Sequence, residues 1–236
     1  MVKVAAVVPA AGCGSRMGSD VKKQFIALAG APILGYVLRI LEASKLVQTI
    51  VVAVGEGEEE YCRRAVVDKL GLKKITAVVQ GGKERQDSVY SGLLALAPDT
   101  DIVVIHDGVR PLLSDENLEM VVGAALAFDA ATCAVPVKDT VKLAREDGFV
   151  AETLPRNRLW LTQTPQAFRY GVILDAHRRA HEENFRATDD AALVERLGMA
   201  VKLVDGSYRN IKITTPEDLI VASALLEASQ AGGGQK

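Results

Sequence analysis

Short runs of Val and Ile recur along the chain without the apolar–polar alternation of a half-exposed strand. Strands buried on both faces have this composition, and they occur mainly in parallel sheets covered by helices. Segments with helical periodicity separate the runs, as in 33–43, where Ile33, Val37 and Leu41 share one face. This order predicts an α/β fold with a doubly wound, mostly parallel sheet. The predicted strands are Val4–Val8, Thr49–Val54, Ile75–Val79, Ile102–Ile105 and Thr132–Val137.

Residues 138–156 depart from this pattern. Asp147 and Gly148 stand between two β-prone pieces, which predicts a β-hairpin. An isolated hairpin is barely stable in water, so we expect a projecting arm that packs against a second subunit. A surface loop without such a role is the alternative.

The rest of the chain returns to mixed elements within one domain, 1–236. Thr215 followed by Pro216 predicts the capped start of a closing helix. Glycines near the end predict a disordered tail, 231–236. The other predicted elements are a helix over Val172–Glu183, a helix from near Asp189, and strands at Val201–Val204 and Ile211–Ile213.

Charge and cysteine content exclude several classes of protein. The net charge of -2 gives no overall attraction to nucleic acid or to an anionic membrane. Cys13, Cys62 and Cys133 are too few and too far apart for a disulfide framework or a Cys-rich zinc site, so the reducing cytoplasm is the expected compartment. The apolar start, 2–11, is short and runs into a glycine turn, which favours a buried first strand over a secretory signal. No later run approaches the ~20 apolar residues of a membrane span.

A loop of small residues follows the first predicted strand, from Pro9 to Gly18. Such loops let backbone N–H groups approach phosphates closely. A dinucleotide fingerprint would need glycine where Met17 stands, and a P-loop would need lysine where Ser19 follows Gly18. What remains is a phosphate loop flanked by the cations Arg16 and Lys23, which suit charge stabilisation in phosphoryl-type transfer.

The loop residues Ala10–Met17 and Lys22–Phe25 match the opening motif of the sugar nucleotidyltransferases, A-A-G-x-G-x-R-M followed by a basic residue. Four further stretches, in the same order, resemble the 2-C-methyl-D-erythritol 4-phosphate cytidylyltransferases, and the likeness runs from about Val4 to Leu226. These stretches are Gly81–Val89, His106–Pro111, Leu159–Gln166 and Asn210–Asp218.

The resemblance implies a Rossmann-like nucleotidyltransferase that makes the CDP derivative of methylerythritol from CTP and 2-C-methyl-D-erythritol 4-phosphate. It implies a homodimer, a role in nonmevalonate isoprenoid synthesis, and Mg²⁺ held mainly by the CTP phosphates. Arg16 and Lys23 are expected to stabilise the transition state. The residues expected to bind the nucleotide are Ala10, Ala11, Gly12, Gly14, Gly82, Ser88 and Asp107.

The same resemblance places the acceptor phosphate between two subunits. Thr188 and Lys212 are expected from the subunit that holds CTP, and Arg156 with Lys212 is expected to direct the attacking phosphate. The residues expected from the subunit that owns the arm are Arg110, Thr140 and Arg156, with Asp107 near ribose, metal or acceptor hydroxyls. The sequence departs from the family pattern at Gly108 and Val109, often alanines, and at Lys83, often acidic, which puts local nucleotide contacts in doubt.

Other reactive side chains have structural alternatives. His106 follows a buried strand and is expected to be structural rather than catalytic. His177 and His181 have the i,i+4 spacing of a zinc pair, but the H-E-x-x-H order is absent and nearby charges predict a solvated face. Cys13 has no local histidine to act as its base. Asp107 has the alternative of capping a turn.

Two rival functions follow from the same residues. A ribitol 5-phosphate cytidylyltransferase shares the CTP loop and differs in its acceptor, although Pro155–Trp160 is closer to the methylerythritol enzymes. An inactive nucleotide sensor is the rival from another class. The presence of Arg16, Lys23, Arg156 and Lys212 argues against the sensor.

Overall fold

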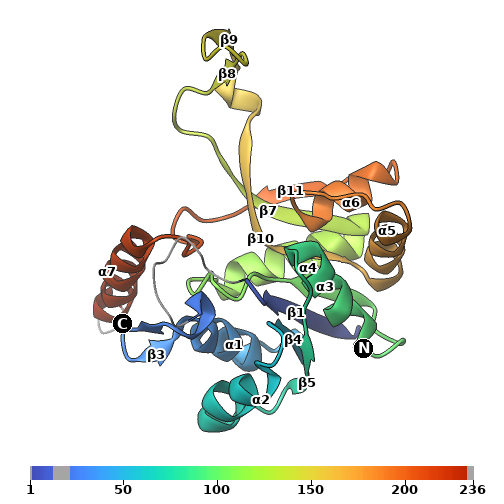
Figure 1. Ribbon diagram of the computed structural model, residues 1–236, viewed down its shortest axis with the longest axis vertical. Coiled ribbons are helices and arrows are strands. Elements are labelled where there is room, and N and C mark those ends of the chain that lie inside the picture. Colours follow the sequence, from blue (N-terminus) through green and yellow to red (C-terminus); the bar gives the residue numbers. More distant parts are fainter. Residues whose placement is uncertain (1, 13–21, 233–236) are drawn as a thin grey trace.

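The computed structural model describes residues 2–12 and 22–232. A seven-stranded sheet, in the order β11–β7–β10–β6–β1–β4–β5, lies between helices on both faces (Figure 1). Six of the strands run in the same direction, so the prediction of a doubly wound, mostly parallel α/β sheet is confirmed. The strands are β1 (Val4–Ala10), β4 (Val47–Val54), β5 (Ile75–Gln80), β6 (Ile102–Ile105), β7 (Ala130–Pro136), β10 (Trp160–Arg169) and β11 (Lys202–Asp205).

Successive residues of β1 point to opposite faces of the sheet. Val4, Ala6 and Val8 enter one hydrophobic cluster, and Ala5 and Val7 enter the other. The first face is covered by α1 (Ile33–Ala43), by α2 (Glu59–Cys62) with the π-helical η3 (Arg63–Asp68), and by α4 (Asp115–Phe128). The second face is covered by α3 (Arg85–Leu94), α5 (Tyr170–Glu182) and α6 (Asp190–Arg196). The predicted helices at 33–43 and 172–183 are therefore confirmed within two residues. Within the described ranges, no helix is long and apolar enough to cross a membrane.

The antiparallel strand β10 has no counterpart among the predicted strands. It lies between β6 and β7, and its register with β7 shifts between Thr162 and Gln166. Pro165 and the polar residues around it do not have the pattern of a central strand, because such strands are usually apolar and contain no proline. Here the polar groups are paired: Gln166 Nε2 donates to Thr132 Oγ1 at 2.9 Å, and Gln163 Nε2 donates to the Ser207 carbonyl at 2.9 Å.

A smaller layer packs beside the sheet. It consists of η2 (Lys23–Phe25), the short strands β2 (Ala27–Leu28) and β3 (Ala31–Pro32), and α7 (Pro216–Gly232). The strand predicted at Ile211–Ile213 is wrong. Ile213 is buried with Leu28 and Val109, and its N–H donates to the Val109 carbonyl at 2.9 Å, so this apolar run packs inside the smaller layer and not in the sheet.

The closing helix α7 begins at Pro216, as predicted. The carboxylate of Asp218 accepts hydrogen bonds from the N–H groups of Thr214 and Thr215 at 2.7 and 2.9 Å, which satisfies donors at the helix start. Ala231 and Gly232 belong to this helix, so the predicted tail begins two residues too early, because alanine favours a helix strongly. Residues 233–236 lie outside the described part of the chain.

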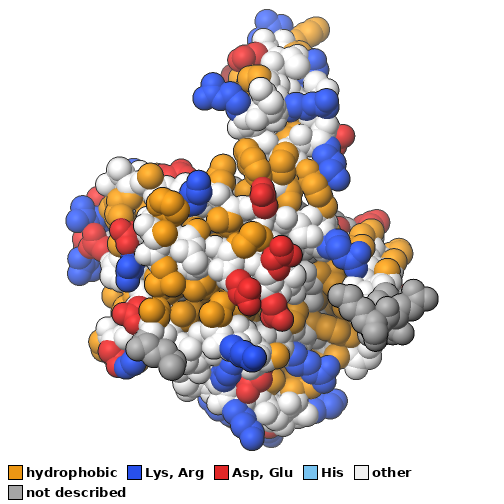
Figure 2. All heavy atoms as spheres, turned by 180° about the vertical axis from the view of Figure 1, so that it is seen from behind, with side chains coloured by type: hydrophobic (Ala, Val, Ile, Leu, Met, Phe, Trp, Pro, Cys, Tyr) orange, Lys and Arg blue, Asp and Glu red, His pale blue; other side chains and the backbone are white. Residues whose placement is uncertain are grey.

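A two-stranded hairpin projects away from the sheet (Figure 1). β8 (Lys142–Ala144) pairs antiparallel with β9 (Val150–Thr153), and the turn between them contains Gly148 at φ +83°. Phe149 and Val150 are more than half exposed. Figure 2 shows hydrophobic side chains along this projection and Lys and Arg side chains around its tip. Its role in dimerisation stays a prediction.

Candidate active site

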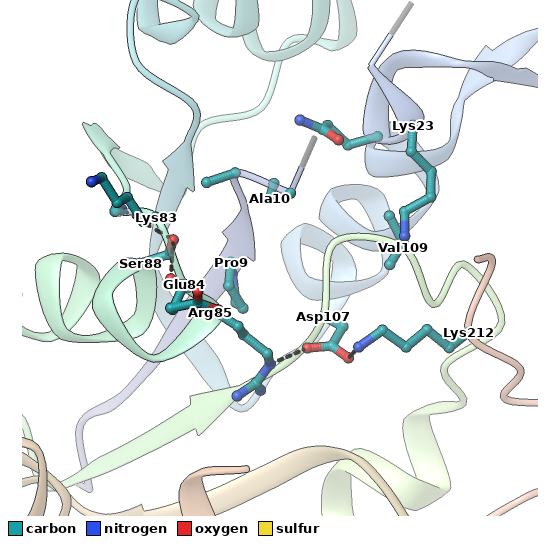
Figure 3. Close-up of a pocket in the computed structure, with 14 residues that line it drawn as sticks. Pro9, Ala10, Lys23, Lys83, Glu84, Arg85, Ser88, Asp107, Val109 and Lys212 are labelled. Carbon is teal, nitrogen blue, oxygen red and sulfur yellow. Dashed lines mark hydrogen bonds and ion pairs between the residues drawn. The ribbon is translucent and has the colours of Figure 1, made fainter. Parts of the chain in front are cut away.

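A cleft with about 550 Å³ of empty volume opens where the carboxyl ends of β1, β5 and β6 meet (Figure 3). The carboxyl edge of an open parallel sheet is the usual ligand site of such folds, because loops from distant parts of the sequence converge there. The lining residues are Pro9, Ala10, Ala11, Gly12, Lys23, Gln24, Gly82, Lys83, Glu84, Arg85, Ser88, Asp107, Val109 and Lys212. Eight of the residues expected at the nucleotide or the transferred phosphate are therefore neighbours.

One wall of the cleft is formed by the loop after β5 and the first turn of α3. Ser88 Oγ donates to the Glu84 carbonyl at 3.1 Å and accepts from the Gly82 N–H at 3.2 Å. A Cβ on Gly81 would lie 2.7 Å from Ala11 Cβ, and a Cβ on Gly82 would lie 2.3 Å from Asp87 Cβ. Glycine is thus required for this loop to pass close to Ala11, at the end of β1, and to Asp87 in α3.

The opposite wall carries Lys23. This residue begins η2, and its side chain extends towards Val109 at the cleft (Figure 3). The neighbouring Lys22 turns to another partner, because its Nζ lies 2.8 Å from Glu58 Oε1. Lys23 therefore lines the cleft, and its predicted catalytic role stays a prediction. Gly14 and Arg16 lie outside the described residues, and their predicted roles stay predictions.

Asp107 is the buried anion at the base of the cleft. Its side chain is 6% exposed and has three cationic neighbours from different segments. Arg85 Nε lies 2.8 Å from Oδ1, Lys212 Nζ lies 2.9 Å from Oδ2, and Arg110 Nε lies 3.6 Å from Oδ2. Burial raises the pKa of Asp107, but Arg85, Lys212 and Arg110 outweigh burial and hold that pKa well below its usual range. Asp107 is therefore an ionised organiser of cations and not a simple turn cap.

Arg85 also connects Asp107 to a second buried carboxylate, that of Asp190. Arg85 Nη1 lies 2.7 Å from Asp190 Oδ2, and Asp190 Oδ1 accepts a hydrogen bond from His177 Nε2 at 3.0 Å. Burial alone lowers the pKa of Arg85, but the charges of Asp190 and Asp107 reverse the effect and raise that pKa. The solvated face predicted for His177 is wrong, because His177 is 1% exposed; His181 is exposed as predicted.

Arg85 and Asp190 are not among the site residues predicted from the sequence. Arg85 lies inside the quoted stretch 81–89, and its position one residue inside a helix that borders the glycine turn was the available signal. Asp190 follows a helix-capping Asp189, whose side chain accepts from the Ala192 N–H at 3.0 Å. Nothing in the local pattern distinguishes Asp190 from a second residue of the cap, so only the tertiary structure reveals it.

A second cleft adjoins the first and shares Arg85, Asp107 and Lys212 with it. Thr188 and Arg110, both predicted to bind the acceptor, line this second cleft. Arg110 was expected to act with the arm. In the structure it is grouped with Asp107 and Lys212 instead, because its Nη1 donates to the Asn210 carbonyl at 2.8 Å and it follows Asp107 by three residues.

Thr140 and Arg156 do not meet these residues within one chain. Both are exposed, and Arg156 Nη1 donates to the Lys138 carbonyl at the base of the arm at 2.8 Å. The arm projects away from the sheet that carries the cleft (Figure 1). Two of the residues predicted for the acceptor are therefore separated from the rest in a single copy of the chain.

His106 is fully buried beneath the cleft. Its Nε2 lies 3.1 Å from the Arg110 carbonyl, and burial lowers its pKa to about 4. The ring is therefore neutral at pH 7, and its Nε2–H donates to that carbonyl. This geometry agrees with the structural role predicted for His106.

A metal site made only of protein side chains is not found among residues 2–12 and 22–232, where no group of three His, Cys, Asp or Glu residues is placed to hold an ion. Asp107, the buried carboxylate shared by the two clefts, is itself paired with Arg85 and Lys212. The expectation that Mg²⁺ is held mainly by the CTP phosphates stays a prediction.

Comparison with known proteins gives one consistent result. Residues 4–228 match the family model for 2-C-methyl-D-erythritol 4-phosphate cytidylyltransferase. A protein of that name from Pelotomaculum thermopropionicum is 63% identical over 230 residues, which cover 98% of this chain and 97% of the relative. Another of that name, from Geotalea uraniireducens, is 51% identical over 229 residues, covering 96% and 98%.

Solved structures agree with the sequence relatives. The 4-diphosphocytidyl-2C-methyl-D-erythritol synthase of Anaerococcus prevotii superposes with a TM-score of 0.85 at 33% identity, covering 96% of each chain. The 2-C-methyl-D-erythritol 4-phosphate cytidylyltransferase of Thermus thermophilus superposes with a TM-score of 0.78 at 32% identity, covering 94% of this chain and 98% of the other.

Proposed function

The chain belongs to the 2-C-methyl-D-erythritol 4-phosphate cytidylyltransferase family, and on this premise we propose how its residues perform the reaction. The protein is a nucleotidyltransferase of the nonmevalonate isoprenoid pathway. It joins CTP to 2-C-methyl-D-erythritol 4-phosphate and forms CDP-methylerythritol and pyrophosphate. The observation that carries the residue assignment is the convergence of five separate segments, around Ala10, Lys23, Gly82, Asp107 and Lys212, on one cleft.

The nucleophile is the acceptor's own phosphate, which is largely dianionic near neutral pH because the second pKa of a monoester is ~6. No protein base has to create it. The phosphate attacks the α-phosphorus of CTP, the bond to the pyrophosphate oxygen breaks, and pyrophosphate leaves with that electron pair. The protein contributes position and positive potential, and Lys23, with Arg16, is the cation assigned to the charge that builds on the α-phosphate.

The nucleotide lies on the loop after β1 and on the wall formed by Gly82 and Ser88. Ser88 Oγ and the nearby backbone groups are suited to read a pyrimidine edge through hydrogen bonds. Lys212 directs the acceptor phosphate from its position beside Asp107. Mg²⁺, bound by phosphate oxygens of CTP, would neutralise part of their negative charge.

The acceptor is held between two copies of the chain, with Thr140 and Arg156 of one arm reaching the cleft of the other copy. Support comes from the exposure of these two residues and of apolar Leu143 and Phe149 beside them. We also propose a cytoplasmic location. The free thiols of Cys62 and Cys133, whose pKa values burial raises to about 12, suit a reducing compartment.

A pyrophosphate-release assay tests this function. CTP with 2-C-methyl-D-erythritol 4-phosphate is expected to give turnover well above that with ATP, GTP or UTP. Ribitol 5-phosphate serves as the matched acceptor and is expected to be turned over far more slowly. Equal turnover of the two acceptors would contradict the assigned substrate, and equal turnover of CTP and UTP would contradict the assigned base recognition at Ser88.

A further inference from the structure

Arg85 divides its donors between two buried carboxylates. Its Nε donates a hydrogen bond to Asp107 Oδ1 at 2.8 Å, and its Nη1 donates one to Asp190 Oδ2 at 2.7 Å. The two acids come from distant parts of the chain, one after β6 and one in α6. Because each acid uses one side of the guanidinium, neither forms the two-bond, bidentate pair that arginine commonly makes with a single carboxylate.

The division determines what remains for Lys212. Asp107 Oδ1 accepts from Arg85, and Asp107 Oδ2 accepts from Lys212 Nζ at 2.9 Å. Asp190 is held in turn by His177, whose Nε2 lies 3.0 Å from Oδ1 with both side chains at most 1% exposed. The result is one continuous series of contacts from His177 in α5 to Lys212 at the cleft (Figure 3 shows its cleft end).

Arg85 also lies where three clefts meet. It lines the nucleotide cleft, the adjoining cleft that contains Thr188, and a third cleft bordered by Gln86 and Arg186. No other described residue lines all three. A shift of its guanidinium would therefore change a wall that the three clefts share.

We propose that Asp190 is a positioning residue for the transfer reaction: by occupying one side of the Arg85 guanidinium, it reserves Asp107 Oδ2 for Lys212 and so places the Lys212 ammonium. This inference rests on the proposed role of Lys212 in directing the acceptor phosphate. When Asp190 loses its charge, Arg85 is free to form a bidentate pair with Asp107, and the guanidinium then competes with Lys212 for Oδ2.

Asp190→Asn tests the proposal with little change in volume. We expect kcat to fall about 10- to 100-fold, the range that follows from misplacing a reacting phosphate by about 1 Å. KM for CTP should change less than about 2-fold, because Lys212 acts on the acceptor. A rise in KM for CTP as large as the fall in kcat would overturn the proposal. The matched control is Asp175→Asn in α5, a partly exposed aspartate paired with Arg178 and Arg179, which should retain wild-type kinetics.

A double-mutant cycle separates positioning from general destabilisation. If Asp190 acts through Lys212, then Asp190→Asn should have almost no further effect on kcat in a Lys212→Ala background. A multiplicative loss would show that Asp190 acts independently, which overturns the inference. If Lys212→Ala by itself keeps full turnover, the proposed role of Lys212 fails; if it loses turnover while Asp190→Asn does not, only the present inference fails.

A second variant keeps the test valid should Asp190→Asn fold poorly. Arg85→Lys keeps the positive charge, but a single ammonium lacks the planar fork that reaches two carboxylates at once. We expect the same loss of kcat and the same absence of a further effect in the Lys212→Ala background. Wild-type kinetics in Arg85→Lys, with a normal melting temperature, would show that the division of donors has no role.

Discussion

The cleft and the arm hold their charged residues in opposite ways. Asp107, at the cleft, is buried and is held by Arg85 and Lys212 from two distant segments and by Arg110 from its own loop. Arg156, on the arm, is exposed and donates to a carbonyl only eighteen residues away. Tertiary contacts therefore organise the cleft within one chain, whereas the arm is organised locally, so the proposed role of Arg156 in catalysis requires a second copy.

The largest effect on turnover is expected from removing a cation of the cleft. Lys23→Ala removes a cation assigned to the charge on the α-phosphate, and loss of one such contact costs about 10²–10³ in rate. We expect that fall in kcat, measured by pyrophosphate release, with a melting temperature close to wild type because Lys23 is partly exposed. Lys22→Ala, at the residue paired with Glu58, is the matched control and should lose much less. A near-normal turnover of Lys23→Ala would remove it from the catalytic residues.

A change in the arm should have a smaller total effect, and it should affect the acceptor more than CTP. Arg156→Ala is expected to raise KM for the acceptor and lower kcat, together about 10- to 100-fold in kcat/KM, since one charged contact to a phosphate is lost. KM for CTP should stay near wild type. Arg158→Ala, at the other end of the same 3₁₀ turn, η4 (Arg156–Arg158), provides the comparison. Equal effects of the two variants would show that general arm charge matters and not Arg156 itself.

Mixing the Lys23→Ala and Arg156→Ala variants sharpens the comparison further. If the arm acts on the partner's cleft, a dimer of one Lys23→Ala chain and one Arg156→Ala chain contains one intact site of two. Random exchange at equal concentrations makes half of the dimers mixed, so activity should recover to about one quarter of wild type. No recovery after confirmed subunit exchange would mean that each arm serves its own cleft.

Low pH should destabilise the body of the protein beneath the cleft through His106. Its folded pKa is about 4, against about 6.5 in the unfolded chain, so the unfolded state alone takes up the proton between these values. Stability should therefore fall as pH falls from about 6.5 to 4, by at most about 3 kcal/mol from this residue. Urea unfolding at pH 7, 5.5 and 4.5 measures it. His106→Gln should flatten the slope in this interval, and an unchanged slope would assign the effect elsewhere.

The smallest effect is expected at the arm turn. Gly148 has φ +83°, where an L-residue costs about 1 kcal/mol or more, so Gly148→Ala should open the hairpin more often. Hydrogen exchange should accelerate in β8 and β9 and stay unchanged in β6. Gly123→Ala is the control: this helical glycine has open space around its Cβ position, so the change should stabilise the body by about 0.5–1 kcal/mol. Faster exchange in β6 of Gly148→Ala would mean that arm and body unfold together.

Much of the fold was predictable because it is encoded in local pattern. The Val- and Ile-rich runs gave β1, β4, β5, β6 and β7, and the helical period gave α1 with its observed ends. The failures share a cause: Ile211–Ile213 and β10 are decided by their neighbours. An apolar run was covered by α7 instead of joining the sheet, and a polar run with Pro165 became a central strand because its side chains found buried partners.

The sequence by itself determined the family and predicted the phosphate loop and its cations, because these depend on residue types at short spacing, such as Gly12 before Lys23 or Gly81-Gly82 before Ser88. Only the tertiary structure decided which charges meet. Asp190 and Arg85 are 105 residues apart, and their contact exists because α3 and α6 pack on the same face of the sheet. An ion pair depends on distance in space and on exclusion of water, and neither quantity can be read from local spacing.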